Sequence, residues 1–101
     1  MNHEDYIEEL KAAILNVHDA TATHVETVPV KETFQGKTIW EGNVEVFDLA
    51  DHPKAERVFA WSHGDPPQHI TVLQIPPATT PLRAVQVAIA GMFREQENAE
   101  S

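Results

Sequence analysis

The sequence predicts a single α+β domain, in which an N-terminal helix, a four-stranded antiparallel meander and a C-terminal helix follow one another. Apolar residues recur at helical spacing near both ends, whereas the middle of the chain is rich in β-branched and aromatic residues and is divided by turn residues. The 101 residues are enough for one hydrophobic core, and no linker or internal repeat interrupts them. We therefore expect one domain over residues 1–101, frayed at residues 1–2 and from about residue 95 to 101.

Two amphipathic helices are expected. Asn2 is a reasonable N-cap for a helix over residues 3–18, and Thr80 followed by Pro81 is typical of the start of a second helix. We expect both helices to lie side by side on one face of the sheet. Their apolar stripes consist of Tyr6, Ile7, Leu10, Ala13, Ile14 and Val17 in the first helix and of Leu82, Val85, Ile89, Met92 and Phe93 in the second.

The four strands are expected to pair in chain order, because short connections favour an antiparallel meander. Gly36 can take the positive φ of a tight turn between the first two strands. Pro29 cannot donate a ladder hydrogen bond, so the first strand belongs at an edge. The fourth strand carries no charged residue and is the less protected edge. The strands are expected at about 23–34, 38–49, 55–63 and 68–75.

Charge and composition exclude several classes of function. Sixteen acidic and seven basic residues give a net charge of −9, which repels phosphate backbones and anionic lipid surfaces, so we expect neither a nucleic-acid nor a membrane partner. Residues 1–51 hold eleven of the acids and three of the bases, a region that is either a solvated face or a dock for a basic partner. No apolar run is long enough for a signal peptide or a membrane span, and a cytoplasmic location is expected. The absence of cysteine excludes disulfides and thiolate chemistry.

The middle strands carry large apolar groups on both sides. A sheet covered on one side should alternate apolar with polar residues, yet Phe59 and Trp61 alternate with Val58 and Ala60. Either a bulge or strong twist buries both sets within one chain, or a homodimer, a protein partner or an apolar ligand covers the second face. We predict a non-enzymatic module that self-associates or docks a protein through this open face or the fourth-strand edge. The expected interface or ligand face consists of Ile39, Trp40, Phe59 and Trp61.

The alternative prediction is a small-ligand or catalytic pocket. His63 and Asp65, together with His69, flank one hairpin loop, where two imidazoles and a carboxylate would converge at a strand end. The chain has six histidines, but none has a fixed metal-ligand spacing, so we expect no metal and no cofactor. These histidines are His3, His18, His24, His52, His63 and His69.

Other catalytic arrangements are weakly supported, and we lean against an enzyme. Ser62 precedes His63, but successive strand side chains point to opposite faces, so these two cannot pair directly. The four glycines are isolated, which excludes a phosphate-binding glycine loop. Three acidic residues of the second strand are interpreted as a ladder that faces solvent. They are Glu41, Glu45 and Asp48.

The order of helix, antiparallel strands and helix is similar to the general plan of double-stranded-RNA-binding domains. In that family a lysine-rich start of the last helix contacts phosphates. The matching stretch here, residues 80–85, has Arg83 as its single base. The resemblance therefore concerns architecture and implies no RNA binding, and the sequence identifies no family.

Overall fold

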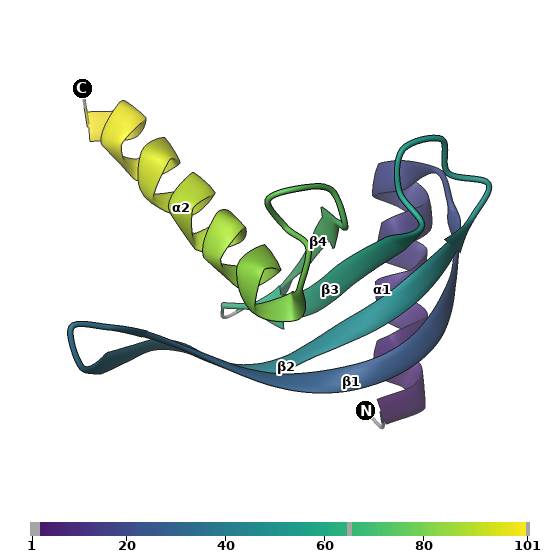
Figure 1. Ribbon diagram of the computed structural model, residues 1–101, viewed down its shortest axis with the longest axis horizontal. Helices are drawn as coiled ribbons and strands as arrows, with labels where there is room; N and C mark the ends of the chain where they lie inside the picture. The colour runs from purple at the N-terminus through teal and green to yellow at the C-terminus, as the bar shows by residue number, and fades with distance from the viewer. Residues whose placement is uncertain (1–2, 65, 101) are drawn as a thin grey trace.

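The computed structural model describes residues 3–64 and 66–100, with side chains described as far as Gly91. The predicted order of elements is confirmed, as Figure 1 shows. Of the segments expected to fray, residues 1–2 and 101 lie outside the described part, and the backbone of the last helix continues through residues 95–100. The elements are α1 (His3–His18), β1 (Thr21–Phe34), β2 (Lys37–Ala50), β3 (Arg57–His63), β4 (Gln68–Leu73) and α2 (Pro81–Glu100).

The four strands form one antiparallel sheet in the order β1-β2-β3-β4, so β1 and β4 are its edges, as predicted. β1 and β2 are joined by a two-residue turn in which Gln35 has φ 52° and Gly36 has φ 79°. Two consecutive positive φ angles match the twist of a hairpin and explain the glycine. The resulting hairpin extends well beyond β3 and β4 (Figure 1).

The two helices lie on opposite faces of the sheet, and the expectation that they share one face is wrong. α1 packs on Phe47 and Val58, whereas α2 packs on Phe59 and Trp61. Val58 and Phe59 are neighbours on β3 and therefore point to opposite faces. In Figure 1, α1 lies behind the sheet and α2 in front of it. This arrangement also departs from the one-sided plan of double-stranded-RNA-binding domains.

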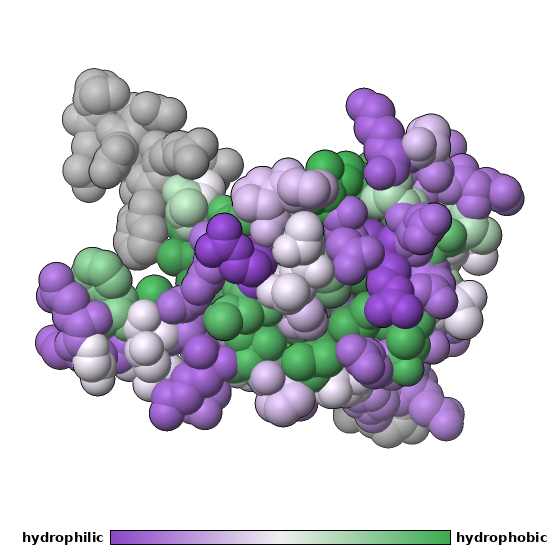
Figure 2. Space-filling model, in the orientation of Figure 1, coloured by the Kyte–Doolittle hydropathy of each residue, from purple (hydrophilic) through white to green (hydrophobic). Residues whose placement is uncertain are grey.

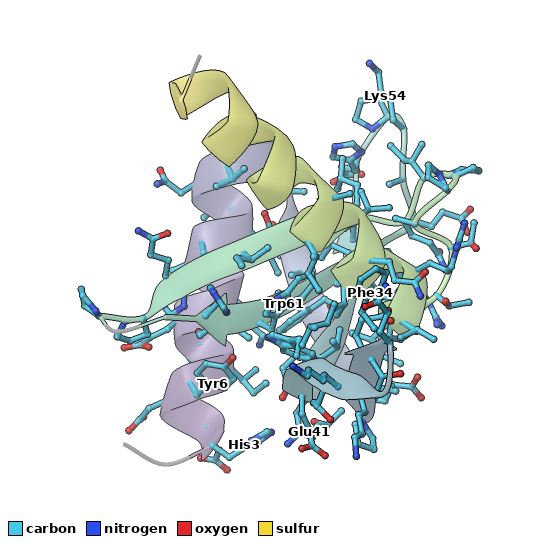
Figure 3. All side chains as sticks on the ribbon, turned by 90° about the vertical axis from the view of Figure 1, so that its left-hand side faces the viewer. His3, Tyr6, Phe34, Glu41, Lys54 and Trp61 are labelled. Carbon is cyan, nitrogen blue, oxygen red and sulfur yellow. The ribbon has the colours of Figure 1, made fainter. Side chains whose placement is uncertain are left out.

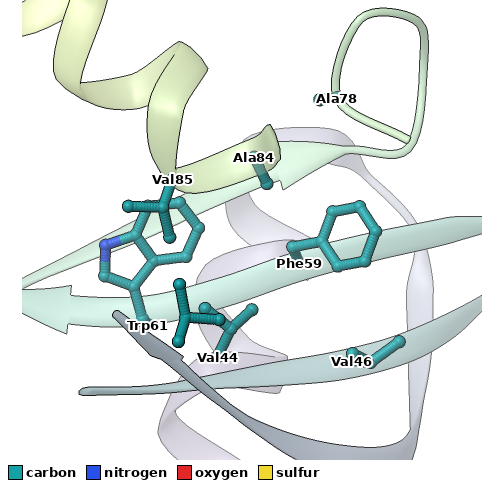
Figure 4. Close-up of a cluster of buried hydrophobic side chains, with 8 residues drawn as sticks. Val44, Val46, Phe59, Trp61, Ala78, Ala84 and Val85 are labelled. Carbon is teal, nitrogen blue, oxygen red and sulfur yellow. The ribbon is translucent and has the colours of Figure 1, made fainter. Parts of the chain in front are cut away.

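Each face has its own hydrophobic core. We call these the α1-face core and the α2-face core. The α1-face core consists of Ile7, Leu10, Ile14, Ala22, Phe47, Val58 and Ala60. The α2-face core consists of Val30, Val44, Val46, Phe59, Trp61, Ala78, Ala84 and Val85 (Figure 4).

The start of α2 is built to approach the sheet closely. The Thr80 hydroxyl accepts a hydrogen bond from the backbone N–H of Arg83 at 3.2 Å, which confirms the predicted N-cap. Ala84 is fully buried, so the helix backbone comes near the strands, and Leu82 faces outward instead of lying in the predicted stripe. Among the described residues, no helix combines the length and the apolar character needed to cross a membrane.

Replacing Trp61 with alanine should lower the free energy of unfolding by about 3–5 kcal/mol, because it removes a large buried ring from the α2-face core. Ile39→Ala is the matched control, since Ile39 is exposed at the hairpin tip and its loss should cost less than about 1 kcal/mol. Urea unfolding followed by circular dichroism measures both values. Similar losses for the two variants would contradict the burial of Trp61.

Candidate functional site

The sheet face expected to be open is covered by the chain's own α2. Phe59 and Trp61 are each only 2% exposed, and Trp40 lies edge-to-face with Trp61 at 6.0 Å between ring centroids. Ile39 is 46% exposed and lies on the β1–β2 hairpin, next to Trp40 in β2. Phe59 and Trp61 are therefore core residues. The apolar residues on both sides of β3 are explained by α2, which covers the second side. A protein interface involving Ile39 stays a prediction.

Apolar surface does remain at the hairpin tip. Phe34 and Ile39 are exposed there, and with Ile89 of α2 they line a groove of about 390 Å³. Figure 2 shows hydrophobic groups among hydrophilic ones at this tip and across the middle of the same face. The possible homodimer expected from the sequence stays a prediction. The groove beside Ile39 is the apolar surface that such a contact would use.

The predicted pocket of His63, Asp65 and His69 does not come together as expected. In the β3–β4 ladder His63 is paired with Gln68, and His69 is paired with Ser62. Because Ser62 and His63 are adjacent, they point to opposite faces, and His69 shares the face of Ser62. Asp65 lies outside the described residues. The structure therefore separates the two imidazoles onto different sides of the sheet.

A different polar cluster lies beneath α1, around Glu45. This residue is 1% exposed and is the one charged residue that is buried among those whose burial is described. His24 Nε2 lies 2.9 Å from Glu45 Oε1, and Thr27 Oγ1 also hydrogen bonds to this oxygen. Since a carboxylate only accepts hydrogen bonds, both neighbours donate. Neither contact uses Oε2.

His3 completes the cluster from the first residue of α1. Its ring lies edge-to-face with that of His24, at 6.0 Å between centroids. One ligand atom from each of His3, His24 and Glu45 lies within 4.8 Å of the others. Figure 3 shows His3 at the start of α1 with its ring directed toward the strands. Three elements, α1, β1 and β2, thus bring two imidazoles and one carboxylate together.

A bulge in β1 arranges the donors around Glu45. The register shifts between His24 and Glu26, so that His24 pairs with Phe47 while Thr27 pairs with Glu45. If the same residues paired regularly after His24, without a bulge, Glu26 would stand opposite Glu45 and two like charges would meet, which is destabilising. The bulge replaces that carboxylate with a hydroxyl donor. The local irregularity of the strand is therefore what satisfies the buried acid.

The sequence interpretation missed this cluster for a physical reason. The interpretation of Glu45 as part of a ladder that faces solvent is wrong, because α1 covers its side of β2. His3, His24 and Glu45 are each separated by 21 positions, and no local motif has this spacing. The signal that could have drawn attention to the site is a single carboxylate inside the apolar run Val44 to Phe47.

A third group of polar side chains lies near the end of α1. His18 Nε2 is 2.8 Å from the Thr71 hydroxyl, and its ring lies 6.5 Å from that of His52. Burial lowers the pKa of the His18 imidazole below its ordinary value of 6.5, and the neighbouring His52 lowers this pKa further. His52 is itself held by the backbone N–H groups of Lys54 and Ala55, which donate to Nδ1 at 3.1 Å.

Comparison of the chain with protein families, with curated proteins and with solved structures gave no match of any of the three kinds. The site is therefore interpreted from its own chemistry. Two imidazoles and one carboxyl group each bring a ligand atom to within 4.8 Å of the others beneath α1, and the carboxyl group is that of the buried Glu45.

Replacing His24 with alanine should lower the free energy of unfolding by about 1–3 kcal/mol, because the buried Glu45 carboxylate loses a hydrogen-bond donor. His63→Ala is the control, since His63 is exposed and its replacement should change stability by less than about 0.5 kcal/mol. Both variants are unfolded in urea with a chelator present. Equal free energies of unfolding for His24→Ala and His63→Ala would show that the buried Glu45 does not need the hydrogen bond from His24.

Stability should fall on acidification, and His18 should account for part of the loss. Because folding lowers the pKa of His18, the unfolded chain takes up the proton first as the pH falls through 6.5. The contribution of His18 to stability is therefore present above pH 6.5, and it is lost as the pH falls from 6.5 to the lower pKa of folded His18. Urea unfolding at about pH 7.5 and about pH 5.5 should show a smaller pH effect in His18→Gln than in the wild type. A pH effect in His18→Gln as large as that of the wild type would refute the role of His18. His63→Gln is the control and should show the pH effect of the wild type.

Proposed function

We propose that the protein binds a divalent transition-metal ion of the zinc class through His3, His24 and Glu45. The observation that carries the proposal is the approach of three ligand atoms to within 4.8 Å of one another around a carboxylate that is 1% exposed. A buried carboxylate is unfavourable unless it is paired, and a divalent cation pairs it more strongly than neutral hydrogen-bond donors do. Burial and donor identity together support a metal site over a solvated histidine cluster.

The donor set indicates which cations fit. Two imidazole nitrogens and one carboxylate oxygen are the ligands of catalytic zinc sites and of two-histidine, one-carboxylate iron sites. Calcium and magnesium take oxygen ligands and would use one of these three groups. Three protein ligands also leave a coordination position for water or a bound molecule. The site thus has the composition of an open centre.

The distances are compatible with coordination after small side-chain movements. Zinc bonds of about 2.0–2.1 Å in a tetrahedron place neighbouring ligand atoms about 3.3 Å apart. His24 Nε2 and Glu45 Oε1 are 2.9 Å apart, and the widest ligand separation is within 4.8 Å. His3 is exposed, so its ring has room to turn toward the other two. An ion there would replace the hydrogen bond between His24 and Glu45.

Thr27 would hold the ligand Glu45 in place through a hydrogen bond. Its hydroxyl donates to Glu45 Oε1 and so fixes the orientation of the carboxylate. Hydrogen bonds of this kind orient metal ligands and increase metal affinity. The β1 bulge that places Thr27 opposite Glu45 is therefore part of the proposed site.

Titration of the metal-free full chain with zinc chloride in a calorimeter tests the proposal. The wild type should bind one zinc ion, and His3→Ala should weaken binding by about tenfold or more, because it removes one of three ligands. His3 is the decisive position, since its ring is exposed and its loss leaves the His24–Glu45 hydrogen bond in place. Equal zinc affinity in wild type and His3→Ala would overturn the proposal.

Two further measurements make the result specific. His63→Ala and His69→Ala should bind zinc as the wild type does, because neither residue belongs to the cluster. Cobalt, used as a visible-light probe at the same site, should give an absorption band in the wild type that His3→Ala loses. A band that persists in His3→Ala would place the cobalt elsewhere and contradict the assignment.

A further inference from the structure

Ser62 and His69 form a hydrogen-bonded pair that is separate from the proposed metal ligands. They are directly opposite each other in the β3–β4 ladder, and Ser62 Oγ lies 2.7 Å from His69 Nδ1. A serine becomes nucleophilic when a neighbouring base can accept its proton. His63, next to Ser62 in sequence, points to the other face, but cross-strand pairing supplies His69 on the correct face. The pair has the separation that proton transfer requires.

Glu9 of α1 lies on the other side of the His69 ring. Its Oε2 is 3.7 Å from His69 Nε2, within ion-pair distance. The rings of Tyr6 and His69 lie in an edge-to-face arrangement with 6.5 Å between their centroids, and Figure 3 shows Tyr6 projecting from α1 toward the strands. A carboxylate beside Nε2 favours the tautomer with hydrogen on Nε2, which leaves Nδ1 free to accept the Ser62 proton. The three groups have the order of nucleophile, base and orienting acid.

A surface depression that is open to solvent runs along α1 beside His69. It has a volume of about 880 Å³ and is lined by His69 and by apolar, polar and acidic residues of and just after α1, which are Glu9, Ala12, Ala13, Leu15, Asn16 and Asp19. The small alanine side chains leave space, and Leu15, which is exposed, provides an apolar wall. Because this depression is open to solvent, a small ester has access to the side of His69.

We propose that Ser62 accepts an acyl group from a small activated ester, with His69 as its base and Glu9 as a positioning residue. Ser62 Oγ attacks the carbonyl carbon while His69 Nδ1 takes the hydroxyl proton. The bond from that carbon to the ester oxygen then breaks, and His69 returns the proton to the leaving alcohol. The product is an ester on Ser62 and a free alcohol, and no metal, oxidant or reductant is required.

Acylation by p-nitrophenyl acetate tests the proposal. The chain has two serines, Ser62 and Ser101, so the full protein contains its own reference nucleophile. Mass spectrometry of the digested protein, kept metal-free with a chelator, measures acetylation at each serine over time. Ser62 should react about 100-fold faster than Ser101, the size of a general-base contribution. Equal rates at the two serines would overturn the proposal.

Variants assign the roles. His69→Ala should bring the Ser62 rate down to that of Ser101, with added imidazole restoring part of it, whereas His63→Ala should leave the rate unchanged. Glu9→Gln should slow acetylation and also change the ¹⁵N shifts of the His69 ring, because Glu9 acts by fixing its tautomer. Circular dichroism confirms that each variant is folded. A His69→Ala protein that keeps the wild-type rate would refute the role of His69, and unchanged rate and shifts in Glu9→Gln would refute that of Glu9.

Discussion

The burial of β2 and β3 on both of their faces is the constraint on which the rest of this structure depends. Phe47 and Val58 need cover on one side, and Phe59 and Trp61 need it on the other. A helix on each side meets this requirement, because each apolar side chain removed from water contributes about 1.5–3 kcal/mol. The sheet is thus the middle layer of the molecule. One helix alone would leave a face of aromatic rings in water.

The two sides of this middle layer differ in chemistry. The α2-face core is built from apolar side chains. The α1 side combines its own apolar core with three groups of polar residues, at the start, the middle and the end of the helix. These groups are centred on Glu45, His69 and His18. Both proposed activities therefore belong to the α1 side, and α2 serves to stabilise the sheet that presents them.

Local features were predictable from the sequence because their causes are local. Helical spacing, the Thr80 cap and the positive φ at Gly36 each depend on a few neighbouring residues, and the structure contains all three. The side on which α2 lies depends on the path of the connection after β4, which carries no comparable signal. The two-sided apolar pattern of β3 is visible in the sequence and leaves open whether the chain itself or a partner covers the second face, and in the structure α2 covers it.

The candidate sites depended on long-range register, which the sequence does not display. A local rule excludes a pair of Ser62 and His63, because neighbouring strand residues point to opposite faces, but His69 becomes the partner of Ser62 through the β3–β4 ladder. Likewise, Thr27 reaches Glu45 because of one extra residue in β1. A bulge of this kind changes which side chains meet without changing the apolar pattern. Propensity and periodicity therefore predict the elements and leave their contacts open.

The alternation along β3 has a consequence for how the strand finds its alignment. Ring-sized side chains, Phe59 and Trp61, project to one side, and the smaller Val58 and Ala60 project to the other. A slip of one position would invert the strand and place the Phe59 and Trp61 rings under α1, where Val58 and Ala60 now pack. Because the side chains on its two sides differ in size, β3 packs well against its neighbours in only one orientation.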